Sequence, residues 1–351
     1  MKFGLFYELQ LPRPLDDETW DPDAERRVFD EMFEQVEYAD KLGFDYVFFV
    51  EHHFLEEYAH STAPEIALAA LARRTNQIRL GHGVIQMPPA MNHPARVAER
   101  IASLDVISGG RVEFGTGEGT SDAELDGFGI ERSLKKSMWE EATRECAKML
   151  SSTPYEGYEG EFFSMPKRNV VPKPLQKPHP PLWVAASRRE TTLLAARFGI
   201  GSLGFGFETP EETALRVEEY YRLIREECFP IGQAINPGLL VLNQFMVADT
   251  DEEAIRRSAD GPGFFSYSLG YYSTSRGRQR DEEGAALIDA HEAGVTNIHK
   301  RFDALPQEQK DGRTQLREAR LLTQQEITER EPDSEVARAL FRAARRGSAI
   351  G

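Results

Sequence analysis

The feature that most constrains the fold is a regular alternation of short apolar runs with amphipathic segments. Apolar and aromatic runs predict strands at residues 2–7, 46–50, 78–85, 111–116, 182–186, 201–205 and 239–247. Apolar residues spaced three or four apart predict helices at residues 26–42, 64–74, 94–107, 135–150, 190–198 and 210–227. Strands that alternate with helices in this way form parallel sheets through right-handed crossovers. Seven repeats favour an α/β fold of the TIM type, a (β/α)8 barrel, over an open sheet.

Two segments depart from this alternation. Residues 155–181 are rich in Gly and Pro and predict a small hairpin near Glu159-Gly160, whereas residues 249–346 are largely helical in pattern, with helices expected at 249–269 and 282–290. Between those two helices, residues 271–283 are polar and fit either a mobile loop or a lid. No eighth strand is visible in the sequence. We therefore expect a single domain over residues 1–351, a barrel truncated before its eighth strand and helix.

The charge and the cysteine content narrow the range of partners. The chain has 351 residues and a net charge of −16, which argues against nucleic acid or an anionic membrane surface as the main partner. No run of about 18 apolar residues occurs, so no membrane-spanning helix is expected. Only two cysteines are present, Cys146 and Cys228, and their separation excludes a CxxC metal motif. Few cysteines in a long chain favour a reducing compartment, the cytoplasm.

The second predicted strand ends in two adjacent histidines. In a TIM barrel the functional side chains lie where strands end and loops begin, and His52 and His53 occupy such a position. Because successive side chains of a strand point to opposite faces, only one of the two can face the barrel interior. That histidine is a candidate acid or base, since imidazole titrates near neutral pH; a structural histidine bonded to the backbone is an equal alternative. Adjacent histidines are poor ligands for one ion, and no metal site is predicted.

Glycines mark the next two strand ends. Gly81 and Gly83 permit close approach by a ligand or by another backbone segment, although glycine in a barrel strand also serves plain packing. The segment 115–119 (GTGEG) is glycine-rich but lacks the lysine and the spacing of a nucleotide P-loop.

The fifth predicted strand leads directly into a helix, and this junction is the best phosphate site in the sequence. A helix start offers free N–H groups and the positive end of a dipole. Ser187 adds a hydroxyl and Arg188 a guanidinium that can bind an anion through two hydrogen bonds. The ordinary alternative is a serine that caps the helix, followed by two solvated arginines.

Taken in order, these motifs resemble the bacterial-luciferase family, and most closely its α-chain type. The resemblance rests on MKFGLF at the start, EHHF after the second strand, NHPARVAE and SLDVISGGRVEFGTG around the fourth strand, and VAAS before a helix, and it covers about residues 1–250. It implies a TIM barrel, a bound reduced flavin (usually FMN) and a homo- or heterodimer. By the same resemblance His52 matches the catalytic base. Gly83-Val84 matches a non-prolyl cis peptide against the flavin ring, and Ser187 matches the serine that holds the flavin phosphate.

Three positions depart from the luciferase pattern. Luciferases have a Cys-Arg pair after the fourth strand whose arginine grips the phosphate, and here these positions are Gly117 and Glu118. The luciferase glutamate before the phosphate serine is Ala186 here. A carboxylate repels a phosphate dianion, so Arg188 or Arg189 would have to substitute. These changes argue against light emission and long-chain aldehydes but not against flavin.

The resemblance implies an enzyme that uses reduced FMN from a separate flavin reductase and O2 to oxygenate a small organic substrate. His52 would relay the proton, and Phe6, Phe48, Phe54 and Phe205 are candidate apolar walls for flavin or substrate. Two alternatives remain open. One is a deazaflavin-dependent oxidoreductase, which transfers hydride, and the other is a non-catalytic flavin-binding partner subunit.

Overall fold

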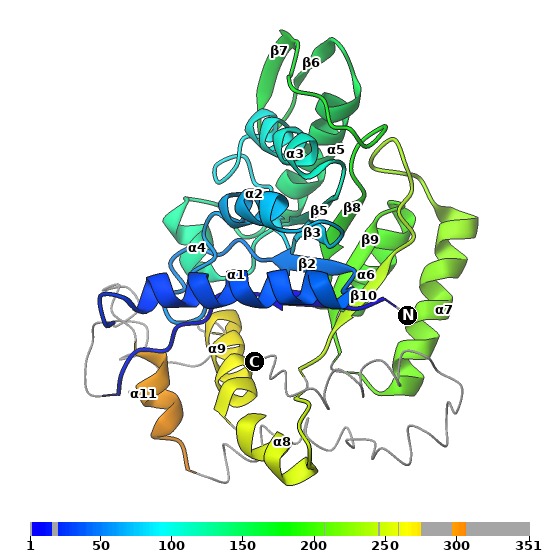
Figure 1. Cartoon of the computed structure of the whole chain (residues 1–351). Helices are drawn as coiled ribbons and strands as arrows, with labels where there is room; N and C mark the ends of the chain where they lie inside the picture. The colour runs from blue at the N-terminus through cyan, green and yellow to red at the C-terminus, as the bar shows by residue number, and fades with distance from the viewer. Residues whose placement is uncertain are drawn as a thin grey trace.

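The computed structural model describes residues 2–15, 20–206, 208–244, 246–258, 260–274 and 297–306. Its main feature is a curved, wholly parallel sheet in the order β1-β2-β3-β5-β8-β9-β10 (Figure 1). The strands are β1 (Gly4–Tyr7), β2 (Tyr46–Phe49), β3 (Arg79–His82), β5 (Val112–Gly117), β8 (Leu182–Ala185), β9 (Gly201–Phe205) and β10 (Leu239–Leu242). A short strand, β4 (Ile85–Gln86), continues β3 and pairs with the end of β5. All seven predicted strands are therefore confirmed, although the seventh ends at Leu242 rather than at residue 247.

Helices connect successive strands, as the alternation predicts. They are α1 (Ala24–Leu42), α2 (Pro64–Arg74), α3 (Pro94–Ser108), α5 (Lys135–Ser151), α6 (Arg189–Arg197) and α7 (Pro210–Glu227). Proline at the first turn starts α2, α3 and α7, because its missing N–H has no partner in a helix start in any case. Gly43 ends α1 in the left-handed conformation, with φ of 85°, that glycine adopts without steric cost. A short helix that the sequence did not predict, α4 (Asp122–Gly127), follows β5.

Residues 155–181, the Gly- and Pro-rich segment, contain the hairpin expected near Glu159-Gly160. Its strands, β6 (Tyr155–Glu159) and β7 (Ser164–Arg168), pair antiparallel. The hairpin projects from the body of the molecule beyond α3 and α5 (Figure 1).

The C-terminal part contains α8 (Asp251–Ser258), α9 (Asp260–Thr274) and α11 (Ile298–Asp303). The predicted polar loop at 271–283 is wrong for its first four residues, which are the last residues of α9. Tyr271 and Tyr272 are buried there, so apolar burial favours continuation of the helix over an exposed loop. The remainder of that loop and the predicted helix at 282–290 lie outside the described residues, as do residues 307–351.

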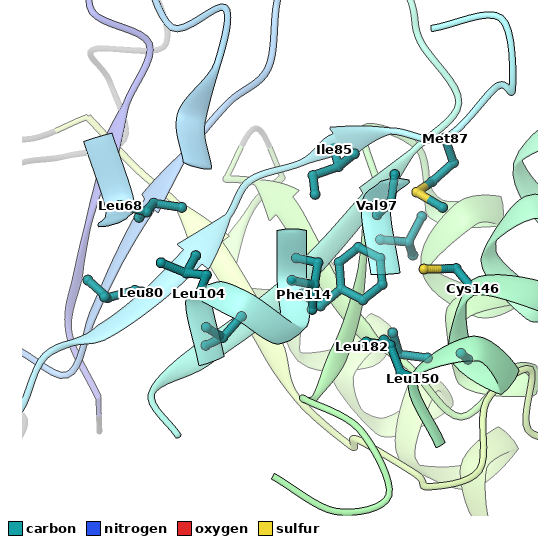
Figure 2. Close-up of a cluster of buried hydrophobic side chains, with 14 of the residues drawn as sticks. Leu68, Leu80, Ile85, Met87, Val97, Leu104, Phe114, Cys146, Leu150 and Leu182 are labelled. Atoms are coloured by element: carbon teal, nitrogen blue, oxygen red, sulfur yellow. The ribbon is translucent and has the colours of Figure 1, made fainter. Parts of the chain in front are cut away.

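The buried apolar side chains form three clusters whose positions follow from strand alternation. The outer cluster fills the layer between the sheet and the helices and includes Leu80 of β3, Phe114 of β5 and Leu150 of α5 (Figure 2). The interior cluster consists of Phe48, Trp183 and Leu203, with Phe6 of β1 and Leu240 of β10 packed against it. Since the first and the last strand of the sheet face one interior, the sheet is a nearly closed barrel.

The third apolar cluster covers the carboxyl ends of the first strands. It joins Val50, Leu55 and Tyr58 from the loop after β2 to Phe264 and Phe265 of α9 and to Ile298 of α11. The C-terminal helices therefore pack over this end of the barrel. Among the described residues, no helix is long and apolar enough to cross a membrane.

Candidate active site at the carboxyl ends of the strands

His52 and His53 point in different directions, as strand alternation predicts. The Nδ1 atom of His52 lies 3.0 Å from Oε1 of Glu124, whereas Nε2 of His53 lies 3.0 Å from Oε1 of Glu51. Both rings are about four-fifths buried. The carboxylate of Glu124 can only accept, so we assign the Nδ1 proton to His52 in its neutral form, which leaves Nε2 as the atom able to take up or release a proton.

Glu124 is the partner that fixes His52, and the sequence analysis did not identify it. It lies on α4, is fully buried, and accepts further hydrogen bonds from the His53 backbone N–H and from the Gln86 side chain. Burial by itself would raise the pKa of Glu124, but His52 and these donors outweigh it and hold that pKa below its usual value. The only sequence signal was the start of a short helix, Ser121-Asp122, directly after the fourth predicted strand.

Burial by itself would lower the pKa of His52, yet the pKa is raised because Glu124, Glu8 and Glu51 stabilise the protonated ring. The charged imidazolium is therefore a stable form of His52 in this site.

A second buried carboxyl group approaches His52 through Tyr58. The Tyr58 hydroxyl donates a hydrogen bond of 2.6 Å to Oε1 of Glu8, and the Tyr58 ring makes an edge contact with the His52 ring at 5.7 Å between centroids. Burial raises the pKa of Glu8 to about 7, with His52 and Tyr58 opposing the shift. Glu8 directly follows β1, so the rule that singled out His52, a polar residue at a strand end, could have found it.

Gly81, within β3, and Gly83, directly after it, have two different roles. A methyl group at Gly81 would lie 2.3 Å from the Phe48 ring, so Gly81 serves the packing of the barrel interior. Gly83 and Val84 are only half buried and lie at the barrel mouth, against Phe48 and Phe6. The cis peptide implied at Gly83-Val84 is not found: the cis bonds among the described residues all precede proline. The trans form is the lower in energy for a non-prolyl bond, by about 3 kcal/mol.

Glu118, at the end of β5, has a neutralising partner. The Nζ atom of Lys135, the first residue of α5, lies 2.7 Å from Oε1 of Glu118 and also donates to the Gly119 carbonyl. Thr116 pairs with Val184, and by this register Glu118 lies level with Ala186 on the neighbouring strand. The carboxylate that stands in the place of the luciferase arginine is therefore compensated by a cation that the sequence analysis missed.

The junction after β8 differs from an ordinary capped helix start. Ala186 is buried and donates its N–H to the Leu203 carbonyl at 2.7 Å, whereas Ser187 and Arg188 are exposed. Arg188, not Ser187, is the N-cap of α6, and no side chain caps the helix. The alternative of a serine cap is wrong, and the first N–H groups of α6 remain available. Arg189 forms an ion pair with Glu219 of α7.

Known proteins match this arrangement over nearly the whole chain. The family model described as "Luciferase-like monooxygenase" matches residues 1–344. The chain belongs to the luciferase-like monooxygenases. The resemblance seen in the sequence is thereby confirmed, and the chain is an oxidoreductase that incorporates oxygen.

One relative in sequence and two solved structures that share the fold illustrate what the chain is similar to. The oxygenase component of flavin-dependent trigonelline monooxygenase from Acinetobacter baylyi is 27% identical over 283 residues, 79% of this chain and 73% of the relative. The structure of monooxygenase RslO1 from Streptomyces bottropensis superposes with a TM-score of 0.67 at 24% identity, covering 92% of this chain and 99% of the other. The oxygenating constituent of 3,6-diketocamphane monooxygenase from Pseudomonas putida, solved with FMN, gives 0.63 at 21% identity, covering 89% and 83%.

In this luciferase-like monooxygenase the predicted site residues all follow strand ends at one edge of the barrel. His52 follows β2, Gly83 and Val84 follow β3, Glu118 follows β5, and Ala186, Ser187 and Arg188 follow β8. His52 and Ser187 are separated by β3 and β5 in the sheet order. Within the described parts of the chain, no group of three or more His, Cys, Asp or Glu could hold a metal ion.

The candidate apolar walls divide into two kinds. Phe6 and Phe48 belong to the barrel interior, and Phe205 packs against the cluster formed with α9 and α11. Phe54 is 54% exposed with φ of 63°, and its ring packs on Phe128 at 5.3 Å between centroids. The interior-facing phenylalanines fit a wall at the barrel mouth, whereas Phe54 lies on the outer rim.

A flavin cofactor fits the groups at this edge. Three buried oxygens, Oε2 of Glu8, Oε2 of Glu124 and Oε1 of Gln86, have no hydrogen-bond partner among the described residues. Buried polar atoms of this kind need a ligand or water to satisfy them. The half-exposed Gly83 and Val84 could contact a flat ring, and the uncapped start of α6 could receive a phosphate.

Proposed function

We propose that this chain is the oxygenase component of a two-component flavin monooxygenase. It binds reduced FMN that a separate flavin reductase supplies and uses O2 to oxygenate a small organic substrate. The observation that carries the proposal is the His52–Glu124 pair, a histidine at the barrel mouth held at 3.0 Å by a buried carboxylate. The trigonelline relative is an oxygenase component, which supports a separate reductase, and the diketocamphane enzyme was solved with FMN, which supports the cofactor.

Within this proposal, Ser187, Arg188 and the first N–H groups of α6 bind the FMN phosphate, and Gly83 and Val84 face the ring. When bound, the reduced flavin supplies the electrons and the atom at which O2 is activated. The protein supplies proton transfer and exclusion of water. His52 holds or releases a proton at Nε2, while Glu124 keeps Nδ1 protonated and the ring fixed.

Exclusion of water falls to the helices that cover the barrel mouth. Phe265 of α9 packs on Tyr58, with 6.0 Å between the ring centroids, and also contacts Phe205 of β9. A substrate bound beside His52 would thus be enclosed by aromatic side chains, which suits an apolar organic molecule.

The protein is further proposed to be a dimer in the cytoplasm. Ile66 of α2 is 71% exposed, and Val106 and Ile107 of the neighbouring α3 are more than 40% exposed, so each helix has exposed apolar side chains that a second subunit would cover. Both cysteines are free thiols, which suits a reducing compartment. Sedimentation of the purified protein as a monomer would exclude the dimer.

The test of the function combines flavin binding with oxygen consumption. The purified chain should bind reduced FMN under anaerobic conditions, and His52→Ala should retain that binding while losing about 100-fold or more of substrate oxygenation. Unchanged turnover in His52→Ala would remove this histidine from the mechanism. Reduction of a deazaflavin without oxygen consumption would favour the hydride-transferring alternative. Flavin binding without oxygenation of any substrate would favour a non-catalytic partner subunit.

A further inference from the structure

One buried guanidinium near the end of β9 lacks the hydrogen bonds that such a group requires. Arg216 of α7 is 5% exposed, and its Nε lies 3.1 Å from Oε2 of Glu208. This contact lacks hydrogen-bond geometry, and both atoms remain buried without a hydrogen-bond partner among the described residues. No described residue accepts a hydrogen bond from the other two nitrogens either. Of its nitrogens, Nε is the one that is both buried and without a hydrogen-bond partner among the described residues, and leaving a buried donor unsatisfied is costly, so Arg216 has unused capacity to bind an acceptor.

Arg216 points to the junction after β8. A methyl group at Gly204 of β9 would lie 3.7 Å from Nη1 of Arg216 and 3.2 Å from the Ala186 carbonyl oxygen. Ala185 pairs with Leu203, which places Ala186 level with Gly204. The guanidinium therefore lies close to the chain just before Ser187 and the start of α6.

The start of α6 provides complementary donors at the same place. This helix has nine residues, begins at Arg189 and has no side-chain cap. The N–H groups of Thr191 and Thr192 donate to the Arg188 carbonyl, which leaves those of Arg189 and Glu190 for a ligand. A buried guanidinium beside a free helix start and an exposed serine hydroxyl suits a phosphate monoester. The net charge of −16 gives no general attraction for anions, so such a site depends on this local arrangement.

The charges on either side of β8 agree with this role. On the β5 side, Lys135 cancels the charge of Glu118. On the β9 side, Arg216 is paired with Glu208, which is 28% exposed and lies in the loop after β9, while Glu190 and Glu219 lie near Arg189 at the start of α6. An arriving phosphate could therefore bind Arg216 while Glu208 turns toward solvent.

We propose that Arg216 binds the phosphate of FMN together with the start of α6, and thereby makes the enzyme select FMN over riboflavin. The proposal rests on the proposed function, because it assigns a residue to the cofactor of that site. It also identifies a positive group, on the other side of β8 from Glu118, that takes over the role of the luciferase arginine.

The experiment compares the dissociation constants of reduced FMN and reduced riboflavin, measured anaerobically from flavin absorbance or fluorescence. Wild type should bind FMN more tightly than riboflavin. Arg216→Met should weaken FMN binding about 10- to 100-fold, the range for a lost hydrogen-bonded charge, and leave riboflavin binding unchanged. Arg216→Lys should lie between the two. Inorganic phosphate should compete with FMN, but not with riboflavin, in wild type.

Arg222→Met is the matched control, since Arg222 lies on the same helix in a surface ion pair with Glu226 and should leave both constants unchanged. Riboflavin binding and the midpoint of thermal unfolding report whether each variant is folded, and Arg216→Lys retains the charge if the methionine variant fails to fold. FMN binding within twofold of wild type in Arg216→Met would overturn the proposal, as would an equal loss for both flavins. A wild-type protein that binds neither flavin would instead refute the proposed function itself.

Discussion

The edge of the barrel has two regions that differ in how their charges are satisfied. Around His52, Glu124 and Glu51 are buried and already accept hydrogen bonds from the protein. Around the start of α6, donors are left unused: no side chain caps the helix, and the buried Nε of Arg216, although ion-paired with Glu208, has no hydrogen-bond partner among the described residues. The first region is organised before any ligand arrives, as acid–base chemistry requires, and the second is completed by an anion.

The largest expected effect comes from removing the charge of Glu124, the partner of His52. Glu124→Gln should retain flavin binding, lower kcat by about 100-fold, and lower the pKa of His52, because the charge that stabilises the imidazolium is removed. The limb of the kcat profile that follows His52 should accordingly move to lower pH.

The matched control for Glu124 is Asp126 on the same short helix, which is exposed. Asp126→Asn should change neither kcat nor the pH profile. A Glu124→Gln enzyme with an unshifted profile would show that Glu124 only supports the fold.

The next effect is on the free energy of unfolding and tests whether burial raises the pKa of Glu8. Its pKa rises from 4.5 to about 7 on folding, so its neutral form is favoured in the folded state, and the stability associated with it is lost as pH rises from 4.5 through 7. Glu8→Gln should therefore be more stable than wild type above pH 7, by at most about 3 kcal/mol, and equally stable below pH 4.5.

Urea unfolding of both proteins across this pH range measures that difference. A difference that does not change with pH would show that Glu8 does not titrate in this window.

A smaller effect is expected at the start of α6. Ser187→Ala and Arg188→Ala should each weaken FMN binding by about 3- to 10-fold, because each removes one exposed donor to the phosphate, while riboflavin binding stays constant. Fluorescence titration measures both constants. Unaltered FMN affinity in the double variant would place the phosphate elsewhere.

The smallest expected effect tests whether Lys135 neutralises the charge of Glu118. Lys135→Met should weaken FMN binding about two- to fivefold, since it leaves an unpaired carboxylate beside the phosphate site. The double variant Lys135→Met/Glu118→Gln should restore the affinity. A loss that persists in the double variant would mean that Lys135 itself contacts the cofactor.

The sequence by itself determined the strands, their parallel order and the place of His52. Periodicity and turn residues are local signals, and right-handed crossovers leave few ways to connect strands that alternate with helices. For the same reason the strand-end positions of His52, Gly83, Glu118 and Ser187 were foreseeable. Local polarity failed at residues 271–274, where two tyrosines bury their rings and the helix continues.

Only the tertiary structure decided the partners of these residues. Glu124 is 72 residues from His52 in the chain, and Tyr58 is 50 residues from Glu8. Arg216 lies on α7 but reaches Gly204, near the end of β9. Such pairs depend on register and on the packing of helices against the sheet, which no local pattern encodes. Burial then sets their chemistry, because the same carboxyl group is an ordinary acid in water and a proton donor or an ion-pair partner in the interior.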